Sequence, residues 1–311
     1  MTYPQGSDPF RAFRPFVACA LLCAATAAQA QDIEPRAYSN APVGVNFLVA
    51  GVAYARGGVA FDTSLPITNP KLETWSALVG YAHVLDLWGT SGKFDVVVPY
   101  SWLFGTAQLA GQPREREVDG FGDPRFRLSV NLYGAPALNL QEFASYRQDL
   151  IIGASLQVAV PVGQYDHSKA INLGSNRWFF KPEVGISKAS GPWTLELTAA
   201  ATFFTDNDDF FNGNKREQDP LYSTQVHTIY GFSGGSWASF DVTYFTGGRT
   251  TLNGVLNSDL QQNWRVGGTY ALPVDRHNSV KFYASSGVSS RTGNDYDLLG
   301  VAWQYRWGGG L

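Results

Sequence analysis

Gly120-Phe121-Gly122-Asp123-Pro124, followed by residues 125–133 (RFRLSVNLY), is the stretch that decides the fold of this sequence. Its first five residues predict a tight loop, because Gly and Pro are the strongest local markers of turns. The following residues place Phe126 and Leu128 on one face and Arg125 and Arg127 on the other. This period of two indicates a strand. Arginines on its polar face favour a transmembrane β-barrel with a polar interior and an apolar exterior.

The N-terminus predicts a secretory signal peptide over residues 1–30. Two arginines precede an apolar run at 16–28, and Ala28-Gln29-Ala30 forms a small-x-small cleavage site. We expect Sec-type export followed by cleavage near Ala30. A short transmembrane anchor is the alternative, and it is disfavoured because the run is too short to span a bilayer.

The composition also favours an outer-membrane barrel. Aromatic residues make up 14% of the chain and charged residues 16%, and no stretch after residue 30 is long and apolar enough for a transmembrane helix. Cys19 and Cys23 both lie within the predicted signal, so the expected mature chain has no thiolate metal ligand and no cysteine nucleophile. The formal net charge of −3 argues against nucleic acid as a partner.

Hydrophobic alternation between turn residues predicts an all-β fold, a transmembrane antiparallel up-and-down β-barrel of about twelve strands, within a range of about 10–14. The expected strands are 43–55, 72–85, 93–104, 125–133, 149–162, 178–188, 193–204, 221–232, 237–245, 262–272, 279–289 and 296–307. Residues 31–42 are expected to form a periplasmic or lumenal N-terminal lead, which could partly plug the lumen. Residues 43–311 are expected to form the barrel.

The connections between these strands alternate in length. Those at 85–92, 189–192, 233–236 and 273–278 are short. Most of those at 56–71, 105–124, 163–177, 205–220, 246–261 and 290–295 are long. An outer-membrane barrel has short periplasmic turns and long extracellular loops. Connection 134–148 breaks the alternation, and we expect a small periplasmic helix or a partly extended turn there.

A secreted soluble β-sandwich or propeller is the alternative fold. Such a fold would also alternate, but it would not place charges such as Lys181, Glu183 and Lys281 on strands whose other faces are purely apolar. Tryptophans near the strand ends fit the aromatic girdles of a membrane barrel. These tryptophans are Trp75, Trp102, Trp178, Trp193, Trp264 and Trp303.

The polar strand faces predict which residues line the interior. The candidates for a lumen-lining or constriction role are Lys93, Asp95, Arg125, Arg127, Lys181, Glu183, Glu196, His227, Asp241, Arg265, Lys281 and Arg306. If strands 93–104 and 125–133 form a hairpin, Lys93 and Asp95 lie opposite Arg125 and Arg127, where opposite charges attract. Such charges either select solutes at a constriction or brace the barrel wall. Both alternatives stand.

Two connections carry clustered charges. Residues 112–123 mix both signs, and they either fold into the lumen as a constriction or form a solvated surface loop. Residues 205–220 are rich in Asp and Asn, and their carboxylates could hold Ca²⁺ or bridge lipopolysaccharide through divalent ions, but their spacing does not match an EF-hand loop. The four histidines show neither metal-ligand nor triad spacing. We therefore expect no metal, no cofactor and no enzyme activity.

Four segments carry a family resemblance. They are Ala37-Tyr38-Ser39-Asn40-Ala41-Pro42-Val43-Gly44, Val118-Asp119-Gly120-Phe121-Gly122-Asp123-Pro124, Tyr146-Arg147-Gln148-Asp149-Leu150 and Phe203-Phe204-Thr205-Asp206-Asn207. Together they resemble the phenol meta-pathway family (MetA-pathway of phenol degradation) of bacterial outer-membrane transporters. The resemblance implies a Gram-negative outer-membrane barrel that moves hydrophobic or aromatic compounds, and it supplies no catalytic residues.

The sequence thus predicts an outer-membrane channel that passes small aromatic or hydrophobic compounds passively. The alternative is a structural or surface-interaction barrel with an occluded lumen, since about twelve strands leave little room once long side chains fill the interior. Expected partners are outer-membrane lipid and lipopolysaccharide, the barrel-assembly machinery through the C-terminal strand, and the solutes. The motif at 120–124, with Arg125 and Arg127 behind it, is the expected gate.

Overall fold

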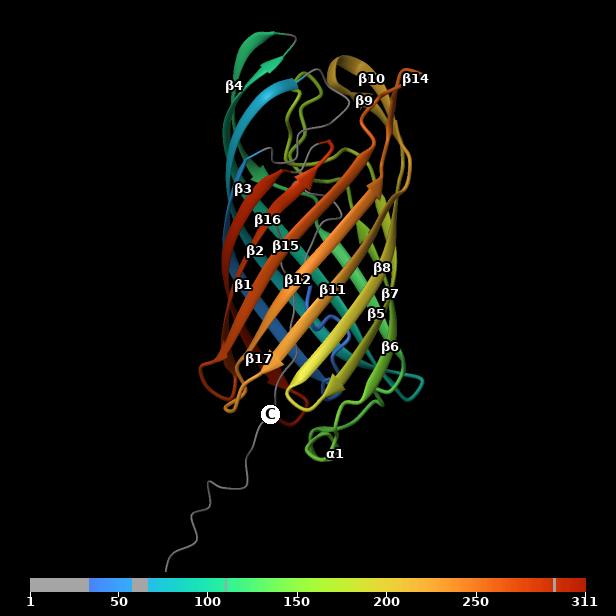
Figure 1. The fold of residues 1–311 in the computed structure, drawn as a ribbon, viewed down its shortest axis with the longest axis vertical. Coiled ribbons are helices and arrows are strands. Elements are labelled where there is room, and N and C mark those ends of the chain that lie inside the picture. Colours follow the sequence, from blue (N-terminus) through green and yellow to red (C-terminus); the bar gives the residue numbers. More distant parts are fainter. Residues whose placement is uncertain (1–33, 58–66, 110, 293–294) are drawn as a thin grey trace, which may run out of the picture.

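The protein is a closed antiparallel β-barrel in this computed structural model, which describes residues 34–57, 67–109, 111–292 and 295–311 (Figure 1). The predicted signal peptide and residues 31–33 of the lead lie outside the described residues. The barrel strands are β1 (Val45–Gly57), β2 (Ile67–Leu87), β3 (Thr90–Leu109), β5 (Arg125–Tyr133), β6 (Leu150–Ala159), β7 (Phe179–Ser190), β8 (Trp193–Phe204), β11 (Leu221–Gly231), β12 (Trp237–Gly247), β15 (Gln261–Pro273), β16 (Asn278–Ser290) and β17 (Tyr296–Gly308).

These strands pair in the order β2-β1-β17-β16-β15-β12-β11-β8-β7-β6-β5-β3, and β2 pairs with β3 to close the circle. β1 pairs along its whole length with β17, from Val45 opposite Gly308 to Gly57 opposite Tyr296. Closure satisfies the backbone N–H and C=O groups between strands, as the interior of a membrane requires. Within the described residues, the predicted up-and-down barrel of about twelve strands is confirmed.

Strand β5 has the inside-out pattern that its sequence predicts. Arg125 and Arg127 are buried in the interior, at 8% and 7% exposure, whereas Leu128 and Leu132 on the outer face are 48% and 60% exposed. The tryptophans near the strand ends are also exposed: Trp75, Trp102, Trp178, Trp193, Trp264 and Trp303. An apolar outer surface of this kind suits contact with lipid.

The interior is not uniformly polar, in contrast to the prediction. Val45, Phe47 and Val49 of β1 point inward and are each 1% exposed, and they pack in one cluster with Leu78 of β2 and Val97 of β3. We call this group of five residues the apolar wall. Inward apolar side chains give β1 two apolar faces, because packed side chains fill this part of the barrel like a soluble core.

Residues 112–123 do not fold into the lumen. Gln112–Phe121 is a strand, β4, which pairs antiparallel with the outer part of β3 as a hairpin (Figure 1). Most of its side chains are exposed, so the inward constriction considered for this segment is wrong. The surface position of the alternative agrees with the structure, with a strand in place of the expected loop. The outer half of β4 is exposed, whereas Arg116 and Val118 on its inner face are half-buried, and Arg116 donates its Nε to the carbonyl oxygen of Ile171 at 3.0 Å.

The motif at 120–124 is a β-bulge rather than a tight loop. Tyr100 of β3 lies opposite Phe121 at the end of β4, and Val97 lies opposite Arg125 at the start of β5. The two registers differ by one residue, so β4 and β5 are one long strand that carries an extra residue at this point. The expectation of a tight loop failed because Gly and Pro also mark bulges.

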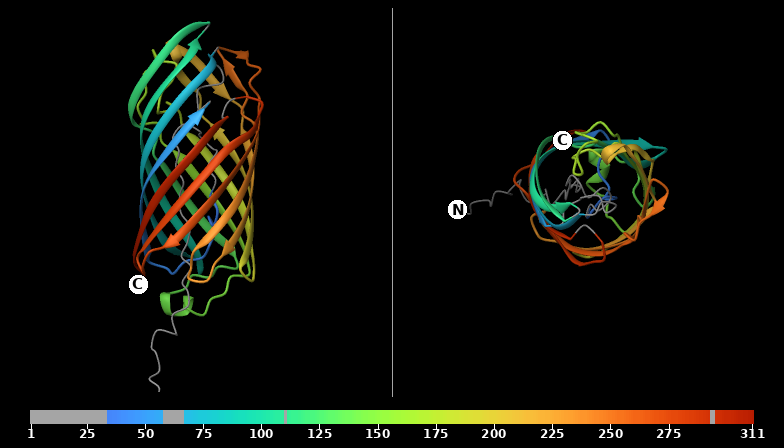
Figure 2. Two further views of the ribbon diagram at one scale, coloured as in Figure 1. Left: turned by 60° about the vertical axis from the view of Figure 1, so that its left-hand side comes forward. Right: turned by 90° about the horizontal axis from the view of Figure 1, so that it is seen from above.

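The two ends of the barrel differ, as the alternation of connections predicts (Figure 2). The end that we call the turn end has short links such as Trp88-Gly89 and Gly191-Pro192, together with helix α1 (Leu140–Phe143) in the connection where a small helix was expected. The loop end carries β4 and a small sheet of β9 (Asn207–Phe210), β10 (Asn214–Gln218), β13 (Thr250–Leu252) and β14 (Val255–Leu256). Among the described residues, no helix is long and apolar enough to cross a membrane.

Candidate solute pathway

Arg127 of β5 is the centre of a charged group that also contains Asp95 of β3 and Glu34, and we call these three residues the charged wall. Because β2, β3 and β5 follow β1 around the barrel, the charged wall lies beside the apolar wall. Arg127 donates its Nε to Oδ2 of Asp95 at 3.0 Å, and its Nη1 forms an ion pair with Glu34. Asp95 and Arg127 meet because they are direct partners in the β3–β5 ladder. Each ion is thereby paired, which offsets the large cost of removing charges from water.

The other two charges of this predicted group have different partners in the ladder. Lys93 lies opposite Ser129, and Arg125 lies opposite Val97. Both side chains are buried, at 3% and 8% exposure. The predicted opposition of charges between these strands is therefore realised between Asp95 and Arg127.

Residues 34–44, which we call the inner segment, cross the interior before β1 begins. Lys93 Nζ donates to the carbonyl oxygen of Ala37 at 2.5 Å. The Tyr38 hydroxyl donates to Oε1 of Glu183 at 3.0 Å, and Oε2 of Glu183 lies 3.5 Å from Lys181 Nζ. The predicted lining residues of β3 and β7 thus hold the backbone and a side chain of the inner segment.

A third attachment reaches β8 and β12. The Arg36 backbone N–H donates to Oε2 of Glu196 at 2.6 Å, and Ser187 donates to Oε1 of the same carboxylate at 2.8 Å. The Arg36 guanidinium lies over the ring of Trp237, 5.4 Å from its centroid. Charge attraction to the ring adds to this contact. The inner segment is therefore fixed from several sides of the barrel.

Two facing glycines make room for Tyr38. Gly153 of β6 lies directly opposite Gly185 of β7. A Cβ atom on Gly153 would lie 2.2 Å from Cδ1 of Tyr38, and one on Gly185 would lie 2.3 Å from Cε2. No side chain fits at such distances, so the ring occupies a slot that glycine alone permits.

The inner segment then leaves the interior at the turn end. The Asn40 side chain donates to the Pro136 carbonyl oxygen at 3.1 Å, and the Val43 N–H donates to that of Leu138 at 2.8 Å. Both acceptors lie in the connection that contains α1. The chain thus runs from the charged wall to the turn end and enters β1.

His227 and Asp241 form a second polar group on the inner face of β11 and β12. Their side chains are fully buried, and His227 Nδ1 lies 2.7 Å from Oδ1 of Asp241. Ser239 donates its hydroxyl to Oδ2 of Asp241 at 2.9 Å. The serine thus contacts the carboxylate and not the imidazole, which is not the order of a nucleophile, a base and an acid.

The remaining candidates lie farther apart. The Arg265 guanidinium lies 3.8 Å from the ring centroid of Tyr296, and its Nη2 donates to Ser285 at 2.8 Å. Lys281 is half-buried on β16. Arg306 donates its Nε to the Arg276 carbonyl oxygen at 2.8 Å, at the turn end. The structure does not bring Arg306 into the charged wall.

At the loop end, the connection 160–178 folds inward. The Asp123 carboxylate of the bulge accepts hydrogen bonds from the Gly163 N–H at 2.9 Å, the Ser175 N–H at 2.8 Å and the Ser175 hydroxyl at 2.6 Å. Ile171 and Leu173 of the connection pack against inward residues of β2 and β3. The bulge therefore holds connection 160–178 against the barrel wall through these hydrogen bonds.

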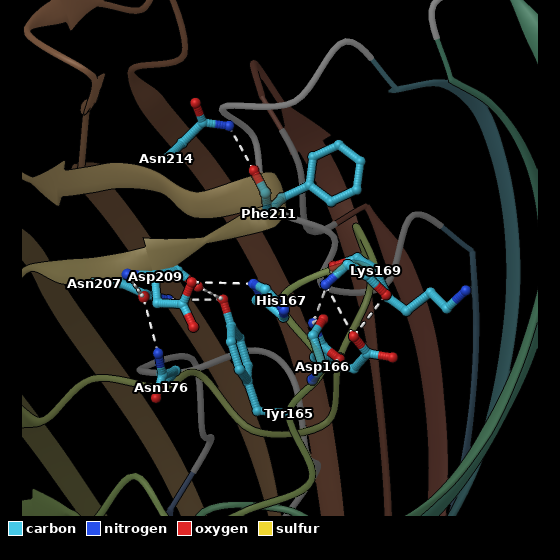
Figure 3. A network of polar contacts seen from close by, with 11 residues as sticks. Tyr165, Asp166, His167, Lys169, Asn176, Asn207, Asp209, Phe211 and Asn214 are labelled. Carbon is cyan, nitrogen blue, oxygen red and sulfur yellow. Dashed lines mark hydrogen bonds and ion pairs between the residues drawn. The ribbon is translucent and has the colours of Figure 1, made fainter.

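Figure 3 shows how the same connection is tied to β9. The buried Asn207 side chain donates to the Tyr165 hydroxyl at 3.0 Å and accepts from Asn176 at 3.0 Å. His167 Nδ1 lies 3.1 Å from an Asp209 carboxylate oxygen. The Asp-rich region 205–220 thus serves in the structure as a partner of connection 160–178.

Asp166 forms a turn within this connection. The Ser168 hydroxyl donates to its carboxylate at 2.7 Å and the Ser168 N–H donates at 2.9 Å. These hydrogen bonds to the ionised form lower the pKa of the Asp166 carboxyl from its ordinary value.

Several residues of the pathway were not singled out from the sequence. Glu34, Arg36 and Tyr38 belong to the lead, whose possible place in the lumen was expected without any contact being named. Ile171 and Leu173 lie in a Gly- and Ser-rich connection that was predicted as a loop. Their alternation was the available signal, because apolar residues at every second position need a surface to pack against.

Comparisons with known proteins agree with this architecture. The model of the family described as "Putative MetA-pathway of phenol degradation" matches residues 55–305. The fold is similar to the crystal structure of an outer membrane channel from Pseudomonas putida F1, with 20% identity, TM-score 0.75, and coverage of 89% of this chain and 100% of that chain. It is also similar to the transport unit of the autotransporter AIDA-I from Escherichia coli, with 7% identity, TM-score 0.51, and coverage of 90% and 94%. None of the curated proteins matches the sequence.

Proposed function

The chain belongs to the family described as the MetA-pathway of phenol degradation, and we propose that it is an outer-membrane channel that passes small aromatic or hydrophobic compounds passively. Lipopolysaccharide slows the entry of apolar solutes, so a protein path through the outer leaflet speeds their uptake without energy input. The name of the family supports aromatic compounds as the solutes.

The observation that carries this proposal is that apolar and charged side chains lie next to each other on the inner face of the barrel. Phe47 and Leu78 of the apolar wall lie on β1 and β2, and Asp95 and Arg127 of the charged wall lie on the next strands, β3 and β5. Small-molecule sites in proteins have this composition, mainly apolar surface with a few placed polar groups. A phenol-sized solute has the same two parts. The inner face therefore matches the chemistry of such a solute better than that of a sugar or a simple ion.

The same proposal assigns roles to the predicted residues. Asp95, Arg127, Lys181, Glu183 and Glu196 line the route and hold the inner segment in it. The bulge at 120–124 positions connection 160–178 at the mouth, so it controls entry through that connection rather than by its own side chains.

The proposal also includes the setting of the barrel. The loop end faces outward and contacts lipopolysaccharide, and the turn end faces the periplasm. The aromatic residues of β17 guide insertion by the barrel-assembly machinery, after Sec-type export and cleavage near Ala30.

Uptake in intact cells tests the proposed function. Initial uptake of a panel of aromatic compounds, with phenol and toluene among them, is compared in cells with and without the gene. We expect loss of the gene to slow their uptake severalfold and to leave a hydrophilic amino acid unaffected. If each aromatic compound entered cells with and without the gene at the same rate, the result would contradict the proposal. It would favour a structural barrel whose inner segment occludes the lumen.

A further inference from the structure

His227 carries an unsatisfied hydrogen-bonding atom inside the barrel. Its side chain is fully buried, and its Nε2 has no hydrogen-bond partner among the described residues. Buried polar atoms without a partner are rare in native proteins, and each calls for an explanation such as a water molecule or a ligand. None of the hydrogen bonds described above for the charged wall involves His227 Nε2.

The other ring nitrogen fixes the chemistry of the free one. His227 Nδ1 faces the Asp241 carboxylate at 2.7 Å, and an ionised carboxylate only accepts hydrogen bonds. The proton of the neutral imidazole therefore lies on Nδ1, and Nε2 presents a lone pair. Ser239 holds Asp241 in place through its second oxygen. The group as a whole presents a fixed hydrogen-bond acceptor to the interior.

The neighbouring strands determine what this acceptor excludes. His227 lies in register between Glu196 of β8 and Asp241 of β12. A solute carboxylate would meet two protein carboxylates in this row, whereas a neutral donor would not. Thr243, two residues along β12 from Asp241, also has a fully buried hydroxyl without a partner among the described residues. The site therefore favours a neutral group that donates a hydrogen bond.

Apolar clusters flank this polar row on both sides. Trp237 packs with Ile229 toward the turn end, and Phe245 packs with Leu221 toward the loop end. All of them share the inner face of β11 and β12 with His227. Because the Arg36 guanidinium covers Trp237, a ring on the side of Phe245 and Leu221 is the one that can direct a substituent to the polar row.

Resting on the channel function proposed above, we propose that His227 Nε2 binds the hydroxyl group of a neutral aromatic alcohol, and that this contact separates aromatic alcohols from hydrocarbons and carboxylates. His227 accepts the hydroxyl proton in a hydrogen bond, Asp241 and Ser239 fix the imidazole, and an adjacent apolar cluster contacts the ring. No covalent bond changes.

Flux through the purified full-length protein tests the selectivity. The protein is inserted into vesicles with a lipopolysaccharide outer leaflet, and the entry of phenol, toluene and benzoate is measured at rising concentration. His227→Phe keeps a ring but removes the acceptor, and we expect it to raise the half-saturating phenol concentration about fivefold, as the loss of one hydrogen bond predicts. Toluene entry should stay unchanged. Ser223→Ala, an inward change on the same strand, is the matched control and should behave as the wild type.

A binding measurement on the wild-type protein keeps the test independent of the variant's folding. The protein is labelled with ¹⁵N at histidine, and the Nε2 resonance of His227 is followed in detergent micelles. Phenol should shift this resonance saturably, whereas toluene and benzoate should not. If phenol does not shift the resonance, the hydrogen-bond partner of His227 Nε2 is water and not a solute, and the proposed site is refuted.

The outcomes separate the site from the channel. Phenol and toluene that enter equally well through the wild type and His227→Phe would refute the site while the channel function stands. The site would also be refuted if benzoate, and not phenol, shifted the Nε2 resonance and saturated the flux. His227, Glu196 and Asp241 would then accommodate a solute carboxylate. If no solute enters, the channel function fails, and the ¹⁵N titration alone decides whether His227 binds phenol.

Discussion

Arg127 illustrates how much of the interior depends on a single side chain. It holds Asp95 of the neighbouring strand and Glu34 of the inner segment at the same time. The sequence could place Arg127 opposite Asp95, because strand pairing in a hairpin is local and alternation sets the inward face. It could not supply Glu34, which is 93 residues away in a segment without alternation.

Replacing Arg127 should therefore destabilise the barrel strongly. Arg127→Ala leaves Asp95 and Glu34 as buried charges without their partner, and we expect the free energy of unfolding to fall by about 3–5 kcal/mol. Guanidinium unfolding in micelles, followed by tryptophan fluorescence, measures the change. Lys188→Ala is the control, because its ion pair with Asp149 is 53% and 77% exposed and should contribute at most about 1 kcal/mol. Equal losses in the two variants would contradict this role for Arg127.

Asp166 provides a dependence on pH at the loop end. The hydrogen bonds from Ser168 lower the pKa of the Asp166 carboxyl below its ordinary value of 3.8. The ionised carboxylate therefore stabilises the turn fully at pH values above 3.8, and this stabilisation is lost as the pH falls through the lowered pKa. The turn is thus insensitive to pH near neutrality. Titration of the Asp166 carboxyl carbon by NMR should give a pKa below 3.8, and Ser168→Ala should raise it. A pKa that does not respond to this substitution would refute the assignment of the cause.

Strands β4 and β5 show where reasoning by element succeeds and where it stops. The bounds of β5 agree with prediction because Phe126 and Leu128 alternate with arginines across an apolar membrane. β4 lies beyond that environment, and its Arg114-Glu115-Arg116-Glu117 run has no apolar face to reveal it. Hydrophobic periodicity arises because the two faces of a strand contact different surroundings. The outer half of β4 is exposed on both faces, so it gives no such signal.

The bulge between these strands should control the mobility of connection 160–178. Asp123→Ala removes the acceptor for the Gly163 and Ser175 amides, and we expect hydrogen exchange at both amides to accelerate at least about tenfold, as the loss of charge-assisted hydrogen bonds predicts. Exchange measured by mass spectrometry or NMR gives the rates. Asp119→Ala, an exposed change in the adjoining strand, is the control. Rates that match this control would show that other contacts hold the connection.

The paired glycines of β6 and β7 should fix the inner segment. Gly153→Ala places a methyl group where Tyr38 now lies, at 2.2 Å from Cδ1, so the ring must leave its slot. We expect trypsin to cleave after Arg36 in this variant while the wild type resists. Gly231→Ala is the matched control, since its nearest atom outside the chain neighbours is 3.6 Å away. Resistance in Gly153→Ala equal to that of the wild type would refute the slot.

At the scale of the whole molecule, strand number, strand order and the contrast between the two ends all follow from local patterns in the sequence. The apolar wall inside the barrel does not. Phe47 and Val49 point inward from β1 and are 1% exposed, although inward residues were expected to be polar. Apolar residues on both faces of a strand look alike in sequence, and contacts such as that of Tyr38 with Glu183 arise only when the barrel closes.

The central claim is that this barrel conducts aromatic solutes passively, and entry of phenol into vesicles with a lipopolysaccharide outer leaflet tests it most directly. Such a leaflet is needed because phenol crosses a plain phospholipid bilayer unaided. The account predicts that the initial rate rises in proportion to the amount of inserted protein, without any energy source, and that it saturates. A rate equal to that of protein-free vesicles would contradict the account and leave a closed structural barrel.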